Sequence, residues 1–323
     1  MKSALQDFKL TKSDFSTFGH GLMRPECVWA DEDGVWVSDN RGGVSRIGDD
    51  GAPVLLGSGI EEPNGFSRAG DGSFVVAGLS DGKLHRIAPD GTTTTLLETL
   101  GGAPVGTINY AWVDSQGRIW VSVMTRRPRW YDKLTDRAPD GYVVLIDKSG
   151  PRIVADGIDV TNEVKLDPEE KYLYAVETLA RRMARFAVKA NGDLGPKETV
   201  GPADLGHGAF IDGFAFDAEG NLWLTLVMRN NLSVLTRDGA LLTLYDEPSQ
   251  PALDKFVADF NQGQAKVEEL PGCAGAFMSL PTSFAFGGPD GRTVYVGSLA
   301  MPHLLTFRSP VAGARHPRPG KLV

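Results

Sequence analysis

The chain has 323 residues, of which 41% are hydrophobic and 23% charged, a composition typical of a folded globular protein rather than a disordered one. A net charge of −8 argues against nucleic acid or an anionic membrane as a partner, because both require clustered Lys and Arg. With no long apolar stretch, no apolar leader and only Cys27 and Cys273, we expect a cytoplasmic protein with reduced thiols, although one disulfide between the two stays open.

One phrase recurs along the chain. It begins with a polar residue, continues through alternating apolar positions into an Asp/Gly turn, and ends in a β-branched or aromatic run. Its copies start at Glu26, Asn64, Asn109, Asn162, Asp212 and Thr282. The alternation has the period of a half-buried strand, and turns such as Asp114 to Gly117 suit a hairpin.

Six strand-only copies of about 54 residues each predict an all-β fold, a six-bladed β-propeller with a central metal site, built as one domain over residues 1–323. Part of residues 10–22 is expected to supply the outer strand of the last blade and so close the ring. An irregular sandwich of the same strands is the alternative.

The leading polar residues predict the metal site. In a propeller the innermost strand of each blade lines the central channel, so the six residues are expected to point at one axial spot. All six carry oxygen and two are carboxylates, which suits Ca²⁺, with Mg²⁺, Mn²⁺ or Zn²⁺ as further candidates. The alternative is that such residues only cap strand starts, which is the simpler interpretation for Asn64 taken alone.

Two segments interrupt the repeat. Residues 126–139 are rich in Arg and aromatic residues, and either cover the channel, with Trp130 against the substrate, or form a solvated rim loop. The insertion at 248–278 contains one apolar helical face, made of Leu253, Phe256, Val257 and Phe260. That helix is expected to cover the channel mouth or to serve a dimer contact.

Two histidines are considered as proton carriers. His207 lies five residues before Asp212 and is a candidate for the pocket edge, although a lone His in a glycine-rich loop is more often structural. His303 is a second candidate, without a defined position relative to the channel.

Four stretches carry a resemblance to a known family: RPECVW (24–29), INYAWVDSQGRIW (108–120), VTNEVKLDP (160–168) and DGFAFDAEGNLW (212–223). They resemble the SMP-30/gluconolactonase family, and the resemblance runs from about Glu26 to Phe307. It implies a six-bladed propeller with one catalytic divalent cation, usually calcium. The implied metal ligands are Glu26, Asn162 and Asp212, with Asn109 as a further ligand or substrate contact.

The resemblance implies a metal-dependent hydrolase that opens a lactone, either a sugar lactone or a related ester. The cation would polarise the carbonyl, and Asp212 would act as general base or nucleophile. The expected substrate contacts are Asn109, Tyr110, Thr107, Trp130 and His207. Thr107 stands where sugar lactonases of the family usually carry Arg, which favours a less sugar-like substrate.

Two other function classes stay open. The same scaffold can carry another enzyme, such as an isomerase, lyase or phosphotriesterase, or can serve as a non-catalytic binding module with a structural ion. Motifs of serine hydrolases, zincins, P-loop NTPases and Rossmann dehydrogenases are absent from the sequence. The expected partner is a small lactone or ester, and the expected assembly is a monomer or homodimer.

Overall fold

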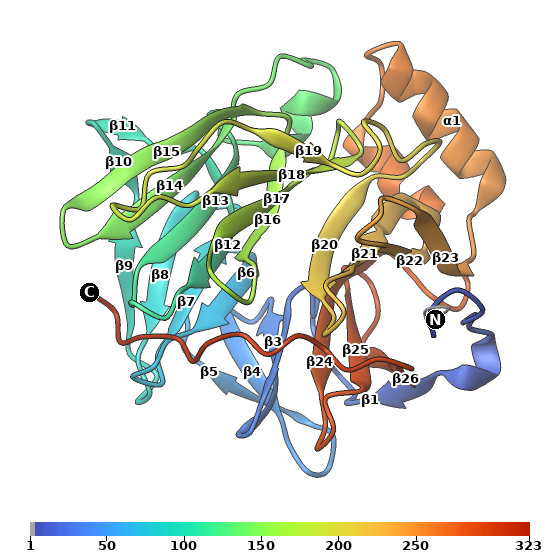
Figure 1. Cartoon of the computed structure of the whole chain (residues 1–323), viewed down its shortest axis with the longest axis horizontal. Helices are drawn as coiled ribbons and strands as arrows, with labels where there is room; N and C mark the ends of the chain where they lie inside the picture. The colour runs from blue at the N-terminus through green and yellow to red at the C-terminus, as the bar shows by residue number, and fades with distance from the viewer. Residues whose placement is uncertain (1–3) are drawn as a thin grey trace.

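The computed structural model describes residues 4–323. Six four-stranded antiparallel sheets are arranged as blades around a central axis (Figure 1). The six-bladed propeller predicted from the repeat is confirmed, and in each blade the recurring phrase supplies the inner two strands.

The first three blades follow the chain in order. Blade 1 contains β2 (Val28–Asp31), β3 (Gly34–Asp39), β4 (Gly43–Ile47) and β5 (Pro53–Leu56). Blade 2 contains β6 (Pro63–Arg68), β7 (Phe74–Gly78), β8 (Lys83–Ile87) and β9 (Thr93–Leu97). Blade 3 contains β12 (Thr107–Val113), β13 (Ile119–Thr125), β14 (Gly141–Asp147) and β15 (Gly150–Ile158).

The last three blades complete the ring. Blade 4 contains β16 (Thr161–Leu166), β17 (Tyr172–Glu177), β18 (Arg182–Ala187) and β19 (Glu198–Val200). Blade 5 contains β20 (Ile211–Phe216), β21 (Leu222–Leu226), β22 (Asn231–Leu235) and β23 (Leu241–Asp246). Blade 6 contains β24 (Pro281–Gly287), β25 (Thr293–Ser298), β26 (Leu304–Arg308) and β1 (Ser16–Phe18).

The remaining elements lie before β1 or in the segments that connect strands or blades. A short hairpin joins β10 (Thr99–Leu100) to β11 (Ala103–Pro104). The helices are α1 (Gln250–Asn261) and the 3-10 turns η1 (Lys12–Asp14), η2 (Trp130–Leu134), η3 (Val227–Arg229) and η4 (Val267–Cys273). In the part of the chain described here, no helix is long and apolar enough to cross a membrane.

The ring closes between blades 6 and 1. β1 pairs antiparallel with β26, which confirms that the segment 10–22 supplies the outer strand of the last blade. At the axis, the hydroxyl groups of Thr282 and Ser283 both donate to the carbonyl oxygen of Glu26, at 2.6 and 2.7 Å. The first and last inner strands are therefore tied together at the centre as well as at the rim.

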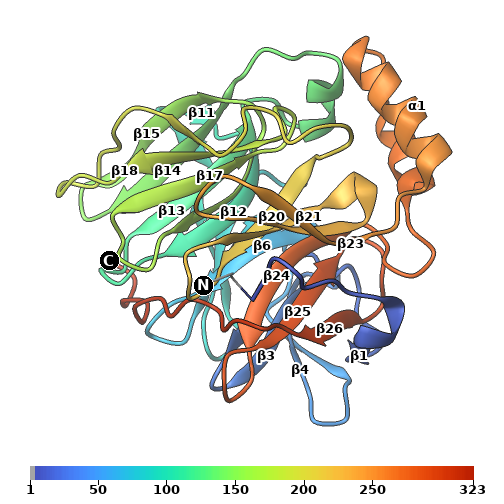
Figure 2. The ribbon, with the colours of Figure 1, turned by 45° about the vertical axis from the view of Figure 1, so that its right-hand side comes forward.

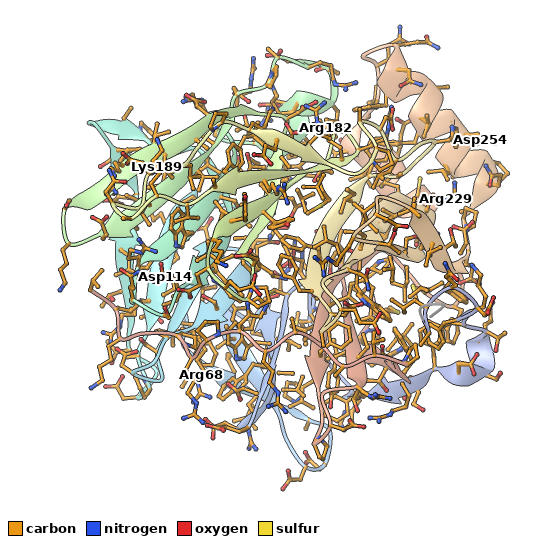
Figure 3. The ribbon with its side chains drawn as sticks, viewed as in Figure 1. Arg68, Asp114, Arg182, Lys189, Arg229 and Asp254 are labelled. Atoms are coloured by element: carbon orange, nitrogen blue, oxygen red, sulfur yellow. The ribbon has the colours of Figure 1, made fainter. Side chains whose placement is uncertain are left out.

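The Asp/Gly turns form as the sequence predicts. The Oδ1 atom of Asp217 accepts the backbone N–H groups of Glu219 and Asn221, and Gly220 takes a positive φ of 81°. The Oδ2 atom of Asp217 accepts the indole N–H of Trp223 from the following strand at 3.0 Å. Asp114, labelled in Figure 3, makes the same bond to Trp120. Each buried aspartate thus joins the turn to the strand after it.

The insertion contains the predicted amphipathic helix. Leu253, Phe256, Val257 and Phe260 of α1 are all buried, so the apolar face is confirmed. Figure 2 shows α1 beside the green segment that carries η2, above the ends of the blades. On another side of the molecule, the C-terminal segment returns across the propeller and bonds to blade 5 through Ala314 and to blade 3 through Gly320.

We predict that Asp217→Ala lowers the free energy of unfolding by about 3 kcal/mol, because it removes a buried acceptor that serves several donors at once. Urea unfolding measures the change. Asp90→Ala is the matched control, since this exposed turn aspartate bonds only to Thr92 and should unfold like the wild type. Equal unfolding of the two variants would contradict the prediction.

Candidate active site

The leading polar residues meet in a cavity near the axis, at one end of the channel. Its volume is about 90 Å³. Five of the six leading residues line it, namely Glu26, Asn64, Asn109, Asn162 and Asp212. Thr282 departs from the expected ring, because its hydroxyl is turned to the backbone of Glu26 instead.

A backbone irregularity aims these side chains inward. In blades 2, 4, 5 and 6 the inner strand places two residues opposite one residue of its neighbour, and the first of the two is the leading polar residue. Blade 3 has register shifts around Asn109. Such bulges rotate side chains out of the alternating pattern of a strand. The polar residue therefore points to the axis rather than to a blade face.

A second local feature precedes the irregularity. Four non-glycine residues adopt left-handed backbone two positions before a leading residue: Arg24 (φ 55°), Glu62 (φ 54°), Val160 (φ 57°) and Leu280 (φ 49°). This conformation costs an L-residue roughly 1 kcal/mol. Its recurrence at one position in four blades ties it to the way the chain enters the channel.

Three oxygen atoms in the cavity are buried without a hydrogen-bond partner among residues 4–323. They are Oε2 of Glu26, Oδ1 of Asn109 and Oδ1 of Asn162. Unpartnered buried oxygens are costly and usually indicate a water or an ion. Among residues 4–323 no three His, Cys, Asp or Glu side chains are placed to hold a metal ion together, but two carboxylates and two carboxamides form a hard oxygen set at the cavity. This set fits a divalent cation such as Ca²⁺.

Asn64 differs from the leading residues with unpartnered oxygens, because its side-chain oxygen already accepts a hydrogen bond. Its Oδ1 accepts a hydrogen bond from Nη2 of Arg24 at 2.9 Å, and its amide nitrogen donates to the backbone of Asn109 at 3.1 Å. Arg24 also lies 3.4 Å from the carboxylate of Glu62. The oxygen of Asn64 is therefore already used, and this residue holds a guanidinium at the cavity wall.

The two cavity carboxylates have altered acidity. Burial raises the pKa of Asp212 to about 8, with a further rise from the charge of Glu163 and a partial offset by Arg24. Burial also raises the pKa of Glu26 well above its ordinary value, and the neighbouring charge of Asp212 adds to this. Two buried like charges resist simultaneous ionisation, and a cation between them would reverse that preference.

An ion pair lies directly behind these carboxylates. The carboxylate of Glu163 is 2.6 Å from Nζ of Lys165 and accepts the backbone N–H of Phe214 at 2.8 Å. A Cβ atom on Gly213 would lie 2.7 Å from the Glu163 carboxyl carbon, so glycine is required there. Lys165 thus compensates the charge of Glu163, and the charges of Glu26 and Asp212 are left to face the cavity.

The structure places some of the expected substrate contacts in the cavity lining and others outside it. Asn109 and Trp130 line the cavity. Thr107 does not, because its hydroxyl donates to the carbonyl of Arg127 at 2.9 Å. Tyr110 lines a different pocket of about 270 Å³, which the C-terminal residues Ala314 to Pro319 border.

His207 also lies outside the cavity lining. It is about half exposed and 2.8 Å from the carboxylate of Asp254, while Arg229 donates to its carbonyl. Figure 3 labels Asp254 on α1 and Arg229 on the blade below it. His303 is likewise absent from the lining, and Cys27 and Cys273 are both free and buried.

Two features of the cavity have weak sequence signals. Arg24 stands two residues before the first leading carboxylate, and only its position in the phrase marks it. The apolar residues opposite the oxygen set, among them Met228, Leu280 and Leu299, come from strand ends and short turns. Hydrophobic periodicity does not separate such residues from the core.

The propeller and its oxygen-lined axial cavity define a class of lactonase-like enzymes. Over residues 24–259 the chain matches the family described as the SMP-30/Gluconolactonase/LRE-like region. It belongs to this family.

Individual relatives are distant. The 6-deoxy-6-sulfogluconolactonase of Pseudomonas putida is 24% identical over 277 residues, which cover 84% of this chain and 82% of that protein. A solved gluconolactonase from Xanthomonas campestris has a TM-score of 0.65 at 20% identity, covering 95% of this chain and 91% of the other. A calcium-binding regucalcin from Agrobacterium tumefaciens has a TM-score of 0.62 at 18% identity, covering 93% and 92%. These two structures share the fold of this chain.

We predict that Asp212→Asn gains stability over the wild type as the pH rises, when both are held free of cations by a chelator. A carboxyl group with a pKa of about 8 when folded, against an ordinary 3.8, binds more protons in the folded state. The wild type therefore loses stability between about pH 4 and pH 8, by about 1 kcal/mol per pH unit.

Urea unfolding between about pH 6.5 and pH 8 tests this, because subtracting the two proteins cancels the groups that do not interact with Asp212. Asp90→Asn, in an exposed turn where the carboxylate accepts from Thr92, is the control and should show a constant difference from the wild type. A difference for Asp212→Asn that stays flat would contradict the raised pKa.

Proposed function

We propose that this chain is a divalent-cation-dependent hydrolase that opens a lactone or a related ester. The observation that carries the proposal is the convergence of three unpartnered buried oxygens and Asp212 on one enclosed cavity. A purely structural axis has no need for such oxygens, because apolar side chains fill it at lower cost.

Glu26, Asn162 and Asp212 are the residues that would hold the cation, with Asn109 as a further oxygen beside them. Ca²⁺ is the favoured ion because every donor is oxygen, and Mg²⁺, Mn²⁺ and Zn²⁺ are the alternatives to test. When bound, a divalent cation supplies Lewis-acid polarisation of the substrate carbonyl.

Asp212 is the residue proposed to act on the substrate. As general base it takes a proton from the attacking water, and the same proton then passes to the ring oxygen as the acyl–oxygen bond breaks. The products are an alcohol and a carboxylic acid on one opened chain, and the acid ionises to a carboxylate by releasing its proton to water. As a nucleophile it would instead attack the carbonyl directly and be released by water.

The neighbours of Asp212 support either role. The ion pair between Glu163 and Lys165 ties the inner strand of blade 4 to that of blade 5, since Glu163 accepts the backbone N–H of Phe214, two residues after Asp212. Arg24 lowers the pKa of Asp212 and so favours its ionised form. The relative from Pseudomonas putida is named a sulfogluconolactonase, which supports lactone opening as the reaction class.

We predict that a chelator abolishes lactone hydrolysis and lowers the melting temperature, and that Ca²⁺ restores both. A ligand at about 100 times its dissociation constant stabilises the folded state by about 2.7 kcal/mol. Differential scanning fluorimetry with each of the four cations measures the shift. Asn162→Ala should lose the shift and Asp254→Asn should keep it. Full activity in a protein shown to be free of metal would refute the cation site.

We predict that Asp212→Asn keeps the fold but reduces kcat at least 100-fold, in line with the loss of a general base. Asparagine preserves the size of the side chain, so a large change in circular dichroism is not expected. Asp254→Asn again serves as control and should retain the wild-type rate. Turnover near the wild-type rate in Asp212→Asn would remove this residue from the reaction.

A further inference from the structure

We propose that the substrate is a compact lactone poor in hydroxyl groups, a five- or six-membered ring with a short alkyl or aryl substituent, rather than a polyhydroxylated sugar lactone. This inference rests on the proposed function and names the substrate class of the same cavity. It follows from how polarity is distributed around the cavity wall.

Both polar and apolar residues line the cavity, and the apolar residues are the majority. Twelve of its nineteen lining residues are apolar. The seven polar ones include the five leading residues already described, together with Arg24 and Thr178. A ligand whose carbonyl group lies at the oxygen set must therefore place the rest of its ring against hydrocarbon side chains.

The polar residues that do not belong to the oxygen set are already bonded within the protein. Thr178 donates its hydroxyl to the carbonyl of Ile211 at 2.8 Å. Arg24 donates to the backbone of Pro63 and to Asn64, and Asn64 uses both ends of its amide. The hydroxyl of Thr178 and the amide of Asn64 are thus turned toward protein partners rather than toward the cavity.

The apolar wall is part of a packed core rather than a mobile rim. Leu134 of η2, Phe256 of α1 and Met228 of η3 are buried and belong to one apolar cluster, and Trp130 and Leu270 pack against it. The guanidinium of Arg137 lies 3.9 Å from the ring centroid of Phe260, which joins the η2 segment to α1. Figure 2 shows these two inserted segments side by side over the channel. We call this surface the roof of the cavity; it is apolar and held in place by packing, and it consists of Trp130, Leu134, Met228, Phe256 and Leu270.

The size of the cavity sets a second limit. About 90 Å³ is small beside the roughly 300–1,000 Å³ of pockets that enclose drug-sized ligands. A single ring with a short substituent is compatible with that volume, whereas a long acyl chain would require the roof to move.

Each hydroxyl of a sugar lactone would lose its water here without gaining a protein partner. A hydrophobic pocket discriminates against an added hydroxyl by about 100-fold. We therefore expect kcat/KM for δ-hexalactone to exceed that for glucono-δ-lactone by at least about 100-fold, with Ca²⁺ present and spontaneous hydrolysis subtracted. Both rings have the same size, so the comparison isolates the hydroxyl groups. A preference below about tenfold, or one for the sugar lactone, would overturn the proposal.

Leu270→Gln tests whether the roof carries the preference. Leu270 is partly exposed and lines the cavity, so an amide there supplies a partner for hydroxyls without emptying the core. We expect it to shift the ratio of the two kcat/KM values at least about fivefold toward the sugar lactone. Val267→Gln, in the same 3-10 helix but outside the lining, is the matched control and should keep the wild-type ratio. An unchanged ratio in Leu270→Gln would refute the role of the roof.

Failure of the inference can be told apart from failure of the proposed function. If the Ca²⁺-loaded protein hydrolyses glucono-δ-lactone as fast as δ-hexalactone, the substrate class is wrong and the lactonase stands. If it hydrolyses neither ring nor a wider panel of lactones and esters, the proposed function itself is wrong. Thermal shift with γ-valerolactone gives a readout apart from turnover: stabilisation that is absent from glucono-δ-lactone supports the apolar wall, and the reverse order contradicts it.

Discussion

The convergence of six inner strands on one axis is the constraint on which the rest of the structure depends. Strands that alternate regularly would turn their first polar residue toward a neighbouring blade. The two-for-one irregularities redirect Asn64, Asn162 and Asp212 into the channel instead. Close approach makes this possible: a Cβ atom on Gly213 would lie 2.3 Å from the carbonyl of Thr282, so blades 5 and 6 can meet only around a glycine.

That convergence buries several carboxylates close to one another, which changes their acidity. Three carboxylates, Glu26, Glu163 and Asp212, are brought close together away from water. Lys165 neutralises Glu163 at 2.6 Å, and Arg24 only partly offsets the other two. Burial without a counterion raises the pKa of both. The arrangement is stable either when protons are taken up or when a divalent cation is bound, so the cavity favours positive charge before any substrate enters.

Much of this architecture could be predicted from local patterns. Period-two alternation and Asp/Gly turns depend on neighbours in the sequence, and they identified the strands and the six blades, while helical spacing identified the apolar face of α1. The common register of Glu26, Asn109, Asn162 and Asp212 located the cavity. The bulges could not be predicted, because the alternation of apolar residues does not fix how two successive strands pair at the leading residue. Thr282 fits the phrase but bonds to the backbone of Glu26, and sequence alone does not distinguish that choice.

The oxygen set and the roof of the cavity come from different parts of the fold. The oxygen set sits on inner strands, where ring closure fixes the backbone and any shift in one blade is transmitted to the next. The roof comes from η2, η3, α1 and η4, which connect strands or blades, and further apolar lining residues such as Leu280 and Leu299 lie at strand ends. Thr107 illustrates the division: it lies on the inner strand of blade 3, but its hydroxyl donates to the carbonyl of Arg127 and it does not line the cavity. The inner strands of the propeller therefore place the oxygen set, while the connecting segments supply part of the apolar lining of the same cavity.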